Sequence, residues 1–111
     1  MIKTYNKLVR DRIPDIIKAG GADCKIEILS DADYIKMIDV KLDEELAEYH
    51  ADQTIEELAD LLEVIYAATK ARGYSLEELE AIRTQKAAER GMFDKKIFLI
   101  ETVENTEDSQ K

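Results

Sequence analysis

Two pairs of carboxylates between residues 41 and 66 are the side chains best suited to chemistry. Glu45 and Glu48 are three residues apart, and so are Glu57 and Asp60. Residues at this spacing lie on one side of a helix, about 60° apart. If the two helices pack side by side, the four carboxylates converge, and like charges in a partly dry site require a compensating cation. Oxygen ligands of this kind suit Mg²⁺, with Mn²⁺ as a possible substitute.

Each pair also has a purely structural explanation. Acidic pairs at this spacing are common on solvated helix faces. Thr54 and Glu57 have the spacing of a capping box, in which Glu57 would only cap its own helix. Asp60 is harder to explain in this way, because Asp is a poor helix former and lies here between apolar residues. Glu44 points nearly away from the expected core, so we rank Glu45 above Glu44 as a ligand.

Two consecutive helices must position these carboxylates. Apolar residues at spacings of three and four predict helices over about 33–50 and 54–71, joined by a tight turn. The second helix has a core stripe that includes Ile55 and Leu62, and a further apolar strip beside it that includes Leu61. A helix that is apolar over so broad an arc usually contacts more than one neighbour. We therefore expect burial against a second subunit, in a homodimer or a tetramer.

The remaining elements are short. Pro14 suits the first turn of a helix over 13–19, and a capping box at 75–78 begins a helix that ends near Arg90. Polar and apolar residues alternate in 24–29, and 96–103 is a second strand candidate, so the two segments could form a minor two-stranded β element. The expected fold is mainly α, a helical bundle in one domain over 1–104, followed by a polar tail over 105–111.

Composition narrows the choice of partners and compartment. The chain has 111 residues and a net charge of -9, which argues against a nucleic acid polymer and against an anionic membrane surface. Cys24 is the only cysteine, so an intramolecular disulfide and a thiolate zinc site are both excluded. The start of the chain is too polar for a signal peptide, and no apolar run approaches the length of a membrane span. We expect a cytoplasmic protein.

Positive charge is concentrated in two places. Lys7, Arg10 and Arg12 lie in the first twelve residues, and Lys86 and Arg90 lie four apart on one face of the last helix. These side chains form either solvated surfaces or binding groups for an anionic ligand.

Three motifs resemble a known family. EELAE at 44–48 followed by ELAD at 57–60 resembles the EExxE…ExxD signature of the all-α NTP pyrophosphatases, the MazG-like proteins, whose relatives include phosphoribosyl-ATP pyrophosphatases and dimeric dUTPases. YNKLVRDRIP at 5–14 resembles the YNKLVRDKIP opening of a small subfamily often labelled phosphoribosyl-ATP pyrophosphohydrolase-like. KAAERGMF at 86–93 resembles the late K..ERGGF segment of that subfamily, with Met92 in place of a glycine.

The resemblance implies a Mg²⁺-dependent hydrolase that converts a nucleoside triphosphate into a monophosphate and pyrophosphate. Glu44 or Glu45 would orient or deprotonate the water that attacks the α-phosphorus. The implied metal ligands are Glu45, Glu48, Glu57 and Asp60. The implied phosphate-binding residues are Lys7, Arg10, Arg12, Lys86 and Arg90. In the family, active sites form in an oligomer of helical subunits, and a role in clearing non-standard nucleotides is implied as well.

Two alternatives stay open. The substrate could be phosphoribosyl-ATP, which would place the protein in histidine synthesis. From another functional class, the chain could be a non-catalytic helical dimer whose acidic helices bind a basic partner. Stability that does not respond to Mg²⁺ would indicate the second alternative, because a ligand that binds only the folded state must stabilise it.

Overall fold

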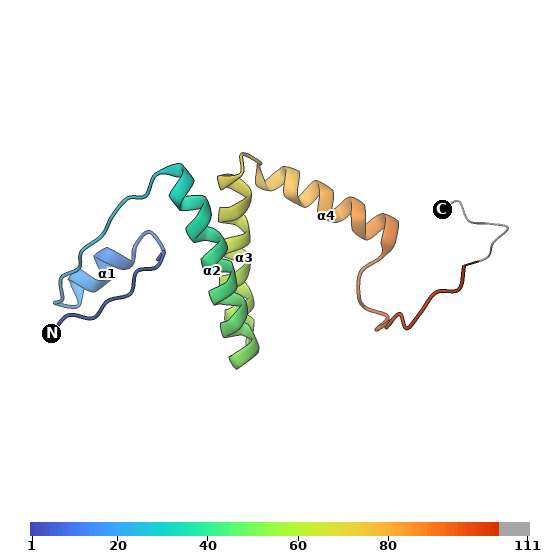
Figure 1. Cartoon of the computed structure of the whole chain (residues 1–111), viewed down its shortest axis with the longest axis horizontal. Coiled ribbons are helices and arrows are strands. Elements are labelled where there is room, and N and C mark those ends of the chain that lie inside the picture. Colours follow the sequence, from blue (N-terminus) through green and yellow to red (C-terminus); the bar gives the residue numbers. More distant parts are fainter. Residues whose placement is uncertain (105–111) are drawn as a thin grey trace. The chain divides into compact units, whose positions relative to one another are not determined.

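The structure is a computed structural model that describes residues 1–104. Within that range it contains four helices and no strand, which confirms the prediction of a mainly α fold (Figure 1). The helices are α1 (Ile13–Ala19), α2 (Asp31–Asp52), α3 (Ile55–Ala71) and α4 (Leu76–Arg90).

Local signals in the sequence explain where α2 and α3 begin and end. The Ser30 hydroxyl accepts a hydrogen bond from the Asp33 N–H at 3.2 Å and caps the start of α2. Gln53 ends α2 in the left-handed conformation, with φ of 56°. Thr54 then caps α3 by accepting a hydrogen bond from the Glu57 N–H at 3.3 Å. Only two residues therefore separate the helices, and they form a hairpin.

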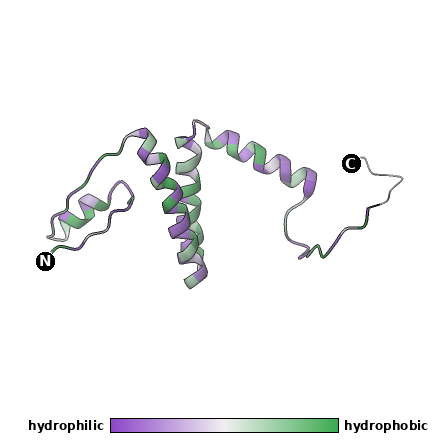
Figure 2. Ribbon diagram, viewed as in Figure 1, coloured by the Kyte–Doolittle hydropathy of each residue, from purple (hydrophilic) through white to green (hydrophobic). Residues whose placement is uncertain are grey.

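Among the described residues, α2 and α3 are the only helices that pack against one another (Figure 1). Ile38 of α2 is the most deeply buried apolar residue of this part of the chain, at 3% exposure. On α3 the further strip that includes Leu61 is partly buried, whereas Ile55 and Leu62 are exposed. The predicted core stripe on α3 is therefore only partly covered, since Ile65 and Thr69 at its later end are partly buried. With α2 as its single helical neighbour in the described structure, α3 can cover only part of the broad apolar arc whose hydrophobic residues recur along it (Figure 2).

The two candidate strands are not formed in the described part of the chain. Residues 24–29 and 96–103 are irregular. Ile28 and Phe98 are residue types that favour strands, but their side chains are strongly exposed. A strand is stable only when a neighbour completes its hydrogen bonds, and a two-stranded pair is marginal even then. The alternating pattern shows that the side chains favour a strand, but it does not show that a neighbouring strand is present to pair with it.

The chain divides into two compact units, Met1–Leu79 and a second unit that begins at Glu80 within α4. The single domain over 1–104 stays a prediction, and the predicted polar tail at 105–111 lies outside the described residues. No helix in the described range has both the length and the apolar character needed to cross a membrane.

Candidate metal site

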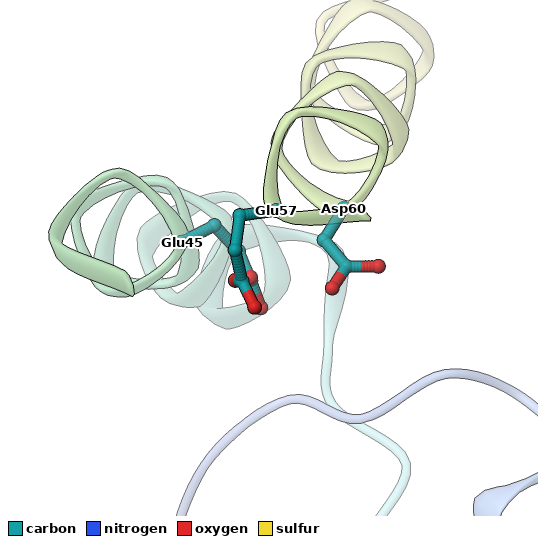
Figure 3. Close-up of side chains that lie close together, drawn as sticks. All are labelled: Glu45, Glu57 and Asp60. Atoms are coloured by element: carbon teal, nitrogen blue, oxygen red, sulfur yellow. The ribbon is translucent and has the colours of Figure 1, made fainter. Parts of the chain in front are cut away.

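Three carboxylates from the α2–α3 hairpin come together at one place. Glu45 lies on α2, and Glu57 and Asp60 lie on α3. One oxygen from each of the three lies within 4.8 Å of the others, and all three side chains point to the same side of the helix pair (Figure 3). This group could hold a metal ion, because clustered carboxylate oxygens are the ligands that hard divalent cations prefer.

Glu45 is the buried member of the cluster. It is 7% exposed, and its Oε2 atom has no hydrogen-bond partner. Burial raises the pKa of Glu45, and the neighbouring Glu48 carboxylate raises it further. A buried carboxylate oxygen without a partner is costly, and a cation bound beside it would remove that cost. Glu45 therefore supplies evidence for a ligand that is independent of the clustering itself.

Glu57 has the same feature on the other helix. Its Oε2 atom is buried and lacks a hydrogen-bond partner. Burial raises the pKa of Glu57, as do the negative charges of Glu48, Asp52 and Asp60. The capping explanation for Glu57 predicts instead a carboxylate turned back toward the start of its helix. In the described structure the Thr54 side chain makes its half of that arrangement, and the Glu57 carboxylate is directed into the cluster (Figure 3).

Two lysines partly offset this negative charge. The Lys41 ammonium lies 3.1 Å from Glu44 Oε1 and 3.5 Å from Glu45 Oε1, and Lys7 lies 3.0 Å from Glu44 Oε2. Burial alone would raise the pKa of Glu44, but the hydrogen bonds from Lys7 and Lys41 bring it below its ordinary value. The hydrogen bond to Glu44 raises the pKa of Lys7 in turn. Glu44 is half-buried and ion-paired, and these ion pairs were not predicted from the sequence.

Asp60 has a different counter-ion. The Arg10 guanidinium donates a hydrogen bond to Asp60 Oδ1 at 2.7 Å. Arg10 and Lys7 both precede α1, so the start of the chain contacts the hairpin at two points, at Asp60 of the cluster and at Glu44 beside it. The family resemblance implies that these cations bind phosphate, and the sequence did not indicate that they would pair with carboxylates of the hairpin.

The other predicted site residues are placed as follows. Glu48 is exposed and is not one of the three clustered ligands, although its charge acts on Glu45 and Glu57. Arg12 is exposed. Lys86 and Arg90 belong to the second unit, where they line an open pocket with Phe93.

Sequence reasoning gave no role to Lys41. Its signal was present, because Lys41 lies three and four residues before Glu44 and Glu45, the spacing at which helical side chains form ion pairs. The pairing of Arg10 with Asp60 had no such signal, since fifty residues separate the two in the sequence.

Comparison with known proteins adds one relative. The chain is 52% identical over 48 residues to an uncharacterized protein of Mycolicibacterium smegmatis. The match covers 43% of this chain and 49% of that relative, so it spans about half the length of the relative. No family model and no solved structure matches the chain.

Proposed function

We propose that this protein is a Mg²⁺-dependent nucleotide pyrophosphohydrolase of the MazG-like type, which hydrolyses a nucleoside triphosphate to a monophosphate and pyrophosphate. The observation that carries the proposal is the Glu45 side chain, buried and with a partnerless oxygen beside Glu57 and Asp60. The EELAE and ELAD motifs support the reaction class by resemblance. Bound Mg²⁺ would offset the negative charge of the substrate phosphates.

Glu45, Glu57 and Asp60 hold the ion in this proposal, and Glu48 completes the ligand set. The residue that orients the attacking water needs a free acceptor oxygen. Both oxygens of Glu44 accept hydrogen bonds, one from Lys41 and one from Lys7, whereas Glu45 Oε2 accepts none. Glu44 is therefore the weaker candidate of the two for orienting the water while both of its ion pairs are formed.

The phosphates of the substrate require positive charge that the acidic helices lack. The proposed phosphate-binding residues are those that the sequence indicated, Lys7, Arg10, Arg12, Lys86 and Arg90. Arg suits this role because its planar guanidinium can bind two phosphate oxygens at once. The proposal includes a homodimer or a tetramer, which the exposed apolar residues Ile55, Leu58 and Leu62 on α3 support.

The test is pyrophosphate release with and without Mg²⁺ across standard and modified nucleoside triphosphates and phosphoribosyl-ATP. We expect release from at least one compound, and only when Mg²⁺ is present. The best substrate then decides between nucleotide clearance and histidine synthesis. No release from any compound, in a folded protein that Mg²⁺ does not stabilise, would contradict the proposal and favour a non-catalytic helical protein.

Asp60→Asn tests the site directly. The variant removes one carboxylate charge and keeps the shape of the side chain, so we expect it to abolish turnover and stabilisation by Mg²⁺ while the helices stay folded, as measured by circular dichroism. Asp43→Asn is the matched control, because Asp43 is exposed on α2 and lies outside the cluster. Full activity in Asp60→Asn would contradict the metal site.

A further inference from the structure

Two ion pairs attach the start of the chain to the α2–α3 hairpin, one at Glu44 and one at Asp60 of the acidic cluster. We call residues 1–12 the N-terminal arm. Lys7 Nζ lies 3.0 Å from Glu44 Oε2, and an Arg10 nitrogen lies 2.7 Å from Asp60 Oδ1. The arm contains no helix or strand, so these side-chain contacts are its main polar connection to the hairpin in the described structure.

The contact of Arg10 differs from that of Lys7 in what it does to the metal site. Glu44 lies outside the group of three carboxylates, whereas Asp60 is one of its members. The guanidinium thus neutralises a ligand and occupies one of its two oxygens. A divalent cation on Asp60 would be repelled by a guanidinium at this distance, because both are positive and share the same carboxylate. Arg10 and the metal therefore compete for Asp60.

We propose that Arg10 is a resident counter-ion of Asp60 which a divalent cation displaces, so that metal binding loosens the N-terminal arm. This inference rests on the metal site of the proposed function, and it adds a residue that sets the affinity of that site. The displaced guanidinium keeps its charge and its planar set of donors. It can then bind an oxygen of an incoming phosphate, which exchanges one anionic partner for another.

The size of the effect follows from the exposure of the pair. The Arg10 side chain is 59% exposed and that of Asp60 is 42% exposed, so water and salt screen the interaction. We expect removal of the Arg10 charge to tighten metal binding by about two- to fivefold. The gain should shrink as the salt concentration rises, because screening weakens the competing ion pair.

The experiment titrates the full chain with Mn²⁺ and measures free Mn²⁺ by electron paramagnetic resonance. Arg10→Gln should bind Mn²⁺ more tightly than the wild type, and Arg10→Lys should restore most of the wild-type affinity. Lys18→Gln is the charge control, because it removes one positive charge from an exposed side chain that forms no ion pair with the cluster and has no role in the proposed function. Its affinity should stay close to that of the wild type.

A second readout follows the arm itself. Trypsin cleavage after Lys7 should become faster in the wild type when Mn²⁺ is added, and it should already be fast in Arg10→Gln without metal. Unchanged or weaker Mn²⁺ binding by Arg10→Gln, with a wild type that binds Mn²⁺, would overturn this inference and leave the metal site intact. A wild type that binds no Mn²⁺ would overturn the metal site and the inference together.

Discussion

Two stretches of this protein have the same capping-box pattern and use it differently. Ser75 and Glu78 form both hydrogen bonds of the box, with the Ser75 N–H donating to Glu78 Oε1 at 2.9 Å and the Glu78 N–H donating to the Ser75 hydroxyl at 3.0 Å. At Thr54 and Glu57, the Glu57 N–H donates to the Thr54 hydroxyl, but the Glu57 carboxylate lies beside Glu45 with one oxygen unpartnered. One glutamate caps a helix, and the other belongs to the acidic cluster.

The difference shows that tertiary contacts can change the direction of a side chain, here Glu57, for which the local sequence pattern predicts a capping role. A lone helix would gain from turning Glu57 back, since the cap satisfies a backbone N–H that is otherwise free. The described conformation places Glu57 among like charges instead, which is unfavourable without a cation. Local signals and the observed structure disagree in this way most often at functional sites.

Substitutions of Glu57 and Glu78 should differ most in their effect on the catalytic rate. Glu57→Gln should lower Mg²⁺-dependent pyrophosphate release by roughly 100-fold or more, because it removes a proposed ligand charge. Glu78→Gln makes the same chemical change at the cap and should leave the rate within about twofold, since a cap distant from chemistry acts only on stability. The rates are compared at saturating substrate and Mg²⁺. Equal losses in both variants would remove the functional distinction.

A second and smaller effect should appear in the thermal stability of the metal-free protein. In EDTA, Glu57→Gln should raise the midpoint of unfolding, because it removes a carboxylate whose pKa burial and nearby negative charges raise. Glu78→Gln should not raise it. In millimolar Mg²⁺ the order should reverse, since the metal stabilises only chains that bind it. Differential scanning calorimetry with and without EDTA measures both. Equal stabilisation of all three proteins by Mg²⁺ would contradict the role of Glu57.

The dependence of the same measurement on pH has a definite sign. The folded-state pKa values of Glu45 and Glu57 lie above the ordinary 4.5, so the folded protein binds these protons more tightly than the unfolded chain does. Their contribution to stability is therefore favourable at low pH and is lost as the pH rises through the raised values. The lowered pKa of Glu44 acts in the opposite direction, and its contribution is lost as the pH falls through that lowered value. In EDTA, Glu57→Gln should make the loss of stability with rising pH less steep.

The smallest expected effect concerns the caps themselves. Ser75→Ala and Thr54→Ala should each lower the free energy of unfolding by about 1 kcal/mol, because each removes a hydroxyl that accepts a hydrogen bond from the first turn. Glu78→Ala should destabilise further through loss of the bond from Ser75 N–H, whereas Glu57→Ala should not, since no such bond is formed at Thr54 in the described structure. Urea unfolding in EDTA measures all four. Destabilisation by Glu57→Ala would restore the capping interpretation.

Much of the helical content was predictable because its signals are local. Ser30, Thr54 and Ser75 begin helices close to the positions that the sequence indicated, and Pro14 lies in the first turn of α1. The prediction of strands at 24–29 and 96–103 was wrong. Alternation of polar and apolar residues indicates a side-chain preference, but it does not provide the neighbouring strand with which a strand must pair. The sequence also could not show which of the two adjacent apolar strips on α3 would be more deeply buried against α2, because both strips satisfy the same periodicity.

The candidate site divides in the same way. The sequence alone determined that Glu45, Glu57 and Asp60 lie on consecutive helices at spacings that let them converge, because helical geometry sets the direction of each side chain. Only the tertiary structure decided that Glu45 is buried with a free oxygen, that Glu48 stays outside the group of three, and that Arg10 reaches Asp60. These features depend on the packing of α2 against α3 and on where a distant arm returns, which no local spacing specifies.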